Sequence, residues 1–232
     1  MSSKTILLST AYLPPVHYMS ALLSADKIII EAHETYLKQT YRNRCVILSA
    51  NGPLPLVIPV IKPKGNHTGI TEVIIDYSTG WNRNHWRAIE SAYRTSAYFE
   101  FIADVLKPFY SNPFNTLWEF NNELLKAILD FLELPVNINF TSTFHKVEPE
   151  GVLDLRYAIS PKAKMPETSL HATLPYFQVF EHRFGFTPNL SVIDLLFNEG
   201  LMARDILRIK DKGYRFKVHG SWFEVEGLKL KF

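Results

Sequence analysis

The sequence has little cysteine and little excess charge, and each shortage excludes a class of protein. Cys45 is the sole cysteine among 232 residues, so no disulfide can form within the chain. The 25 Lys and Arg residues nearly balance the 23 Asp and Glu residues, which gives a net charge of +2. Proteins dedicated to nucleic acids usually carry a strong basic excess on one face. We therefore expect no nucleic-acid partner.

Long hydrophobic runs are also missing. The longest stretch without a charged residue extends from Thr5 to Ala25, and it is interrupted by Pro14, Pro15 and His17. A membrane helix needs about 20 consecutive apolar residues, so we expect no membrane span. The apolar run at 6–8 is too short for the core of a signal peptide. The expected location is the cytoplasm.

The common signatures of metal and nucleotide sites are absent as well. The sequence contains no His-Glu-x-x-His, no cysteine pair, no Gly-x-x-x-x-Gly-Lys loop, no Gly-x-Gly-x-x-Gly and no Gly-x-Ser-x-Gly elbow. We therefore expect no metal site. The identity of a cofactor and the oligomeric state are not predicted by any pattern in the sequence.

The patterns that are present predict an α/β fold. Residues Thr5–Thr10 form a buried apolar run, Val16–Ser24 has helical spacing, and Lys27–Ile30 is a second apolar run. A strand, a helix and a second strand in this order typically build a parallel sheet. With 47% hydrophobic residues, the chain has enough apolar surface for a substantial core.

The remainder of the chain extends this fold. Alternating apolar residues at 214–232 predict a short antiparallel meander, and four prolines predict an ordered loop at about 145–175. We expect a single α/β domain over residues 1–232, with a small mixed or parallel sheet flanked by helices. The other expected elements are a hairpin formed by Cys45–Leu48 and Leu54–Val60, a short strand at Val73–Ile75, and helices at Asn84–Phe99, Thr116–Leu132 and Ser191–Glu199.

The densest polar cluster is the segment Lys38–Arg44. If this segment is extended, Lys38, Arg42 and Arg44 lie on one side, where they would bind a phosphate or carboxylate. Asn43 lies between the two arginines and belongs to the same candidate substrate site. The alternative is a charged edge strand that discourages pairing between sheets.

The segment Tyr12–His17 follows the first expected strand. Ligands of open α/β sheets bind at the carboxyl ends of strands, and the start of the following helix favours anions. Tyr12 is thus a candidate for substrate binding at a pocket rim, and His17 is a candidate catalytic residue. The alternative is a proline-fixed turn in which the polar groups of His17 are satisfied locally.

Asp194 and Asn198 are four residues apart and share one face of the last expected helix. They are candidate catalytic residues that would orient a substrate or a base. The alternative is helix capping, because Ser191 and Asp194 have the spacing of a capping box. We also expect Asp194 or Asn198 to approach the Lys38–Arg44 segment, since a partly buried carboxylate needs a charged partner.

These segments together resemble the WbqC-like family of bacteria. The motifs Tyr-Arg-Asn-Arg at 41–44 and Asn-Leu-Ser-x-x-Asp-Leu-Leu-Phe-Asn at 189–198 carry most of the resemblance. The resemblance implies a role in the synthesis of surface polysaccharides such as O-antigen, where some members are described as glycine transferases acting on amino sugars. The matching segments are Tyr12–Pro15 with Tyr18 and Asp26, Lys38–Arg44, Gly52–Val60, Trp81–Tyr93, Pro175–Phe180 and Phe184–Gly200.

The functional expectation is therefore a transferase that acts on an amino-sugar precursor, with a small molecule or sugar nucleotide as its partner. One alternative is an adenylate-forming or nucleotidyl-transferring enzyme that uses the Tyr12–His17 loop. The loop has a weak resemblance to His-x-Gly-His nucleotidylyltransferases, in which His17 matches the first histidine but Met19 and Ser20 replace the other two motif residues. Another alternative is a sugar-nucleotide binding protein without catalytic activity.

Overall fold

The structure is a computed structural model. It describes residues 4–147, 149–162 and 175–208, and the backbone of three strands at 215–218, 221–226 and 229–230. Its helices are α1 Val16–Leu23, α2 Trp81–Tyr93, α3 Phe99–Ser111, α4 Leu117–Phe131, α5 Glu181–Phe184, α6 Val192–Glu199 and α7 Ala203–Arg208, with short 3-10 turns at Gly65–His67, Ile70–Glu72 and Gly200–Met202.

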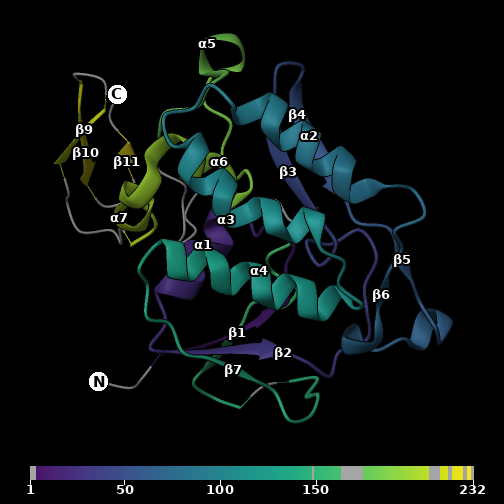
Figure 1. The fold of residues 1–232 in the computed structure, drawn as a ribbon. Coiled ribbons are helices and arrows are strands. Elements are labelled where there is room, and N and C mark those ends of the chain that lie inside the picture. The colour runs from purple at the N-terminus through teal and green to yellow at the C-terminus, as the bar shows by residue number, and fades with distance from the viewer. Residues whose placement is uncertain are drawn as a thin grey trace.

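A four-stranded parallel sheet forms the centre of the fold (Figure 1). Its strand order is β7-β2-β1-β8, and β1 pairs in parallel with both of its neighbours. The chain first adds strands on one side of β1 and then returns to the other side. The boundary between β1 and β8 is therefore the switch point where open α/β sheets bind ligands. The strands are β1 Thr5–Ser9, β2 Lys27–Glu31, β7 Ile138–Phe140 and β8 Val152–Asp154.

The two faces of this sheet differ in character. Ile6, Leu8 and Ile30 point into the main hydrophobic core, and in Figure 1 helices α1 and α4 lie above this sheet. Glu31 is the register partner of Ser9 on β1, and side chains of paired residues lie on the same face. Because side chains alternate along a strand, the Glu31 carboxylate lies on the opposite face from the core.

The remaining strands are small antiparallel pairs. The hairpin of β3 Arg44–Ser49 and β4 Gly52–Val57 turns at Gly52, which has a φ of 102°. β5 Val60–Ile61 pairs with β6 Ile74–Ile75. At the end of the chain, β10 Ser221–Glu226 pairs with β9 Arg215–Val218 and β11 Lys229–Leu230. The predicted α/β class, the hairpin and the C-terminal meander are thus confirmed, although residues 219–220, between β9 and β10, lie outside the described residues.

Several boundaries differ from the sequence prediction. The helix expected at 84–99 ends at Tyr93, and a separate helix, α3, begins at Phe99. The helix expected at 116–132 is confirmed as α4. Thr116 caps its start, because Thr116 Oγ1 accepts a hydrogen bond from Glu119 N at 3.2 Å. Among the described residues, no helix combines the length and apolar character needed to cross a bilayer.

The loop expected at about 145–175 contains a strand that was not predicted. Residues Val152–Asp154 form β8 and complete the parallel sheet beside β1. The part of this loop at 163–174 lies outside the described residues. Three residues are too few for a strand pattern to be recognised, and β8 is defined by its pairing with Thr5–Leu7 across the chain.

Candidate functional site

Five charged side chains meet at the carboxyl end of the parallel sheet. Glu31, Glu34, Arg42 and Arg156 are buried, whereas the Asp154 side chain is 29% exposed. Buried charges are costly unless they are paired, and such clusters are common at functional sites. This group, named here the carboxyl-end cluster, therefore forms the candidate site.

Arg156 connects two strands of the sheet. Its Nη1 donates to Glu31 Oε2 at 2.7 Å, and its Nε and Nη2 donate to Asp154 Oδ1 and Oδ2 at 3.0 and 2.7 Å. Glu31 ends β2 and Asp154 ends β8, so the Arg156 side chain spans β1, which lies between them. Thr141 Oγ1 and His33 N also donate to Glu31 Oε1, both at 2.7 Å. The guanidinium is thereby held at the switch point of the sheet.

The charge of Asp154 is maintained by this contact. Partial burial acts to raise the pKa of Asp154, but the hydrogen bonds and the charge of Arg156 together lower it by more. The net shift of the pKa is therefore downward. Asp154 is therefore ionised at neutral pH and is the member of the cluster that solvent reaches. Tyr157 lies beside it, 51% exposed, with its ring centroid 5.8 Å from the guanidinium carbons of both Arg42 and Arg156.

Arg42 is occupied by a second buried pair. Its Nε and Nη2 donate to Glu34 Oε1 and Oε2 at 2.7 and 2.5 Å, and its backbone oxygen accepts from Asn121 Nδ2 at 2.8 Å. Burial raises the pKa of Glu34, although Arg42 opposes this shift. Arg42 Nη2 also lies 3.5 Å from the backbone oxygen of Arg156, so the two arginine pairs are adjacent.

The segment Lys38–Arg44 is not extended, which corrects the sequence prediction. Residues before Arg44 form turns, and the strand begins only at Arg44. The parity argument that placed Lys38, Arg42 and Arg44 on one side therefore does not apply. Asn43 holds the end of the hairpin, because its Nδ2 donates to Ile58 O at 2.8 Å, and its buried Oδ1 has no hydrogen-bond partner.

Lys38 and Arg44 differ from Arg42 in having no carboxylate partner within the part of the chain that the structure describes. Lys38 is exposed, and the buried Nε of Arg44 has no hydrogen-bond partner. Desolvation and the neighbouring charge of Lys38 lower the pKa of Lys62. Among the described residues of this segment, Lys38 and Arg44 thus remain available to an anion. Lys62 lies beside Lys38, and its Nζ donates to Asn66 Oδ1 at 2.9 Å.

Tyr12 is a core residue, contrary to its expected place at a pocket rim. Its side chain is fully buried, and its hydroxyl lies 2.8 Å from the Tyr110 hydroxyl and 3.0 Å from His85 Nδ1. Its ring also packs against Phe120, at a centroid distance of 5.8 Å. The strand that precedes it, β1, is an interior strand of the sheet.

His17 is buried and has one free ring nitrogen. Its Nδ1 bonds to Asn189 Oδ1, and its Nε2 has no hydrogen-bond partner among the residues that the structure describes. Because an amide oxygen only accepts, Nδ1 carries the hydrogen and Nε2 presents a lone pair. Burial lowers the pKa of His17, so the ring is neutral at pH 7. The His17 ring lies edge-on to the ring of Tyr41, with 6.4 Å between the ring centroids. Tyr41 directly precedes Arg42, the partner of Glu34.

The start of α1 is closed by the segment around Asn189. Val16 N donates to Leu190 O at 2.9 Å, His17 N donates to Asn189 Oδ1 at 3.2 Å, and the next two amides donate to Pro15 O. A phosphate bound at the start of α1 would have to accept hydrogen bonds from those same amides. The anion site that the Tyr12–His17 loop was expected to provide is therefore filled by protein atoms.

Asp194 is surrounded by hydrogen-bond donors. Tyr93 and Tyr176 donate through their hydroxyls at 2.8 Å, and Gln178 Nε2 donates at 3.0 Å. Burial raises the pKa of Asp194 to about 6, although these hydrogen bonds act in the opposite direction. Among the described residues, Asp194 forms no ion pair with Arg42 or Arg44, contrary to the expectation from the sequence. Asp194 instead joins α2, α6 and the segment that contains Tyr176.

Helix capping does not explain Asp194 either. Ser191 is the N-cap residue of α6, but its hydroxyl donates to Leu13 O at 2.9 Å and does not cap the helix. Asn198 Nδ2 donates to Asp194 O at 2.7 Å, and its buried Oδ1 has no hydrogen-bond partner. Both residues therefore hold α6 in place within the core.

Sequence reasoning missed four of the five members of the carboxyl-end cluster. Glu31 follows an apolar strand directly, a signal that would have identified it as a residue at the carboxyl end. Asp154 and Arg156 lie in the segment interpreted as a loop, and Glu34 precedes the recognised polar cluster. Within the described ranges, no group of three or more His, Cys, Asp or Glu side chains is placed to hold a metal ion.

Comparison with known proteins identifies relatives of the chain. The model of the WbqC-like protein family matches residues 10–165, which include His17 and the whole carboxyl-end cluster but not Asp194. The uncharacterized protein Rv1507c of Mycobacterium tuberculosis is 30% identical over 228 residues, covering 88% of this chain and 97% of the relative. No solved structure matches the chain.

Proposed function

Because the chain belongs to the WbqC-like protein family, we propose that it is a transferase of surface-polysaccharide synthesis that moves glycine or another acyl group to the amine of an amino-sugar precursor. The observation that carries this proposal is the Asp154 carboxylate. It is fixed by Arg156 at the switch point of a parallel sheet and is open to solvent. A carboxylate in this position supports recognition of a substrate ammonium group.

The balance of charge supports the same assignment. Counted with their formal charges, Glu31, Glu34 and Asp154 contribute three negative charges, and Arg42 and Arg156 contribute two positive charges. The cluster therefore has one net negative charge, which attracts a cationic group and repels an anionic one. An amino group at the exposed Asp154 would complete the neutralisation.

A sugar nucleotide also carries a diphosphate, and we assign this part to Lys38 and Arg44. These residues have no carboxylate partner among the described residues, unlike Arg42. Arginine binds phosphate oxygens through two N–H groups, and lysine acts as a point charge. Lys38, Asn43 and Arg44 thus remain the predicted substrate-binding residues of this segment. Arg42 is assigned a structural role, because it pairs with Glu34.

The proposed reaction is an acyl transfer from an activated donor such as an acyl phosphate or thioester. The bound ammonium group first loses one proton to bulk water, which leaves a neutral amine. The amine nitrogen then attacks the carbonyl carbon, and a C–N bond forms. The bond from that carbon to the leaving group breaks, and its electron pair departs with the leaving group. The nitrogen then loses a second proton, for which the neutral Nε2 of His17 is the proposed acceptor once substrate binding exposes this buried atom. Asp194 and Asn198 are proposed as positioning residues, because they fix α6, which follows the Asn189 that binds His17.

A ligand panel followed by a turnover assay tests the proposal. UDP-glucosamine at 100 times its dissociation constant would stabilise the protein by about 2.7 kcal/mol, which thermal melting detects. Mass spectrometry with a glycyl thioester then shows whether the sugar amine becomes acylated. Stabilisation by ATP and not by UDP-glucosamine would overturn the proposal in favour of nucleotidyl transfer. Stabilisation by UDP-glucosamine without acylation by any activated glycine would overturn the catalytic assignment and indicate a binding protein.

A further inference from the structure

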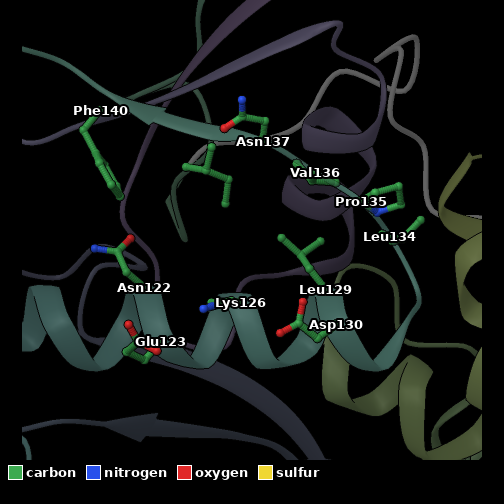
Figure 2. Close-up of a pocket in the computed structure, with 11 residues that line it drawn as sticks. Asn122, Glu123, Lys126, Leu129, Asp130, Leu134, Pro135, Val136, Asn137 and Phe140 are labelled. Carbon is green, nitrogen blue, oxygen red and sulfur yellow. The ribbon is translucent and has the colours of Figure 1, made fainter.

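A groove separate from the carboxyl-end cluster runs between α4 and β7 (Figure 2). Its volume of about 610 Å³ is in the usual range for small-molecule sites. None of its lining residues belongs to the cluster. The lining residues are Asn122, Glu123, Lys126, Leu129, Asp130, Leu134, Pro135, Val136, Asn137, Ile138 and Phe140.

One end of the groove has an exposed aromatic ring. Phe140 is 52% exposed at the end of β7, and its ring centroid lies 5.3 Å from that of Trp118 on α4. Figure 2 shows the Phe140 ring pointing from the strand toward Asn122 on the helix. Trp118 thus packs against Phe140, and the exposed part of the Phe140 ring offers an apolar surface to a ligand in the groove.

The groove also presents hydrogen-bonding groups that the protein does not use. Within the described residues, Glu123, Lys126, Asp130 and Asn137 have no side-chain hydrogen bond or ion pair. They offer carboxylate acceptors, ammonium donors and an amide that does both. Their charges sum to one negative charge. Phosphorylated ligands are therefore disfavoured, and neutral or amine-bearing ligands are favoured.

We infer that the α4–β7 groove binds a saccharide that is neutral or carries an amine. A sugar ring combines an apolar C–H face, which fits the exposed ring of Phe140, with hydroxyl groups that both donate and accept. Those hydroxyls match the unused carboxylates and the amide along the groove walls. The inference does not depend on the proposed reaction, because it holds equally for an enzyme and for a binding protein.

A peptide strand fits the same groove less well. A peptide would add to the free edge of β7, but β7 has only three residues and offers few outward backbone groups. The preceding Pro135 has no backbone N–H to donate. Side chains therefore supply most of the polar groups of the groove, which favours a polyhydroxylated ligand.

Titration of the full chain with N,N′-diacetylchitobiose, a neutral disaccharide here called chitobiose, tests the inference. We expect amide shifts in NMR spectra at Asn137 to Phe140 and along α4, together with a change in Trp118 fluorescence. Replacing Phe140→Ala should weaken chitobiose binding about fivefold or more, because an aromatic contact of this kind is lost. Glucosamine 6-phosphate should bind more weakly than glucosamine, because the groove is net negative.

The matched control is Phe101→Ala, which removes an aromatic ring that is 68% exposed on α3, outside the groove. It should leave chitobiose binding unchanged. The inference is overturned if chitobiose does not bind, if it shifts amides elsewhere, or if folded Phe140→Ala binds it as tightly as Phe101→Ala does. Preference for an extended peptide over chitobiose would also overturn it. The variant Asp154→Asn should retain chitobiose binding, which separates this test from that of the proposed function.

Discussion

The guanidinium of Arg156 donates to the carboxylate of Glu31 at 2.7 Å, and neither side chain is accessible to solvent. The two residues are far apart in the chain and meet across β1, so this contact fixes the carboxyl end of the parallel sheet. It also sets the position of Asp154, which Arg156 holds with its other nitrogens.

Replacement of Glu31→Gln should therefore destabilise the fold strongly. The substitution leaves part of a buried positive charge unpaired, which typically costs about 3 kcal/mol or more. The free energy of unfolding in urea measures this loss. Arg204→Ala is the control, because Arg204 forms a solvent-exposed pair with Glu133 at 3.1 Å. That pair should contribute less than about 1 kcal/mol. Equal losses in the two variants would contradict the structural role of the Arg156 contact.

The stability of the protein should depend on pH through two opposing effects. Burial lowers the pKa of His17, and it lowers that of His85 to about 4. Below about pH 6.5 these two histidines bind protons in the unfolded chain but not in the folded chain. Acidification therefore reduces the free energy of unfolding. Asp194 and Glu34 act in the opposite direction, because burial raises the pKa of both carboxyls, that of Asp194 to about 6. Between about pH 4 and 6 the folded chain binds the Asp194 proton first, so acidification adds stability.

Replacement of Asp194→Asn should consequently steepen the loss of stability on acidification. The variant removes the stability that protonation of Asp194 adds between pH 6 and 4, and it leaves His17 and His85 in place. Urea denaturation at several pH values measures the slope, with the exposed Asp104→Asn as control. A slope that is unchanged in Asp194→Asn, or shallower than in Asp104→Asn, would contradict the raised pKa of Asp194.

Gly200 tests the packing of the last helices. Its φ is +56°, and a Cβ at this position would lie 2.5 Å from the ring of Tyr98. Gly200→Ala should therefore lose about 2–3 kcal/mol of stability, since overpacking adds to backbone strain. Gly65 has a similar φ of +58° but no atom within 4 Å of such a Cβ. Gly65→Ala should lose only the strain, about 1 kcal/mol. Similar losses at the two positions, measured by thermal melting, would show that Tyr98 does not restrict Gly200.

Much of the fold was predictable because its signals are local. The apolar run at Thr5–Ser9, the capping of α4 by Thr116 and the turn at Gly52 each depend on a few neighbouring residues. The strands β7 and β8 were missed because each has three residues, and their place is set by pairing with distant strands. Helix α3 was missed because Pro108 lies within it, and proline normally ends a helix.

The site was less predictable, because its charges come from segments that only the fold brings together. Lys38–Arg44 was identified as polar, but the sequence did not show that Arg42 is paired with Glu34. His17 was identified from its place after a strand, whereas its partner Asn189 is 172 positions away. Asp154 and Arg156 gave no signal, since a short alternating stretch between prolines is typical of a loop.

The most direct test of the central claim is the affinity of Asp154→Asn for two sugar nucleotides, measured by calorimetry at pH 7. UDP-glucosamine carries a free amine, whereas the amine of UDP-N-acetylglucosamine is acylated and uncharged. If Asp154 binds the amine, the variant should lose about tenfold in affinity for UDP-glucosamine, because a charge-assisted hydrogen bond is lost. Its affinity for UDP-N-acetylglucosamine should be unchanged. Equal losses for both ligands, or no loss for either, would contradict the assignment of the amine site to Asp154.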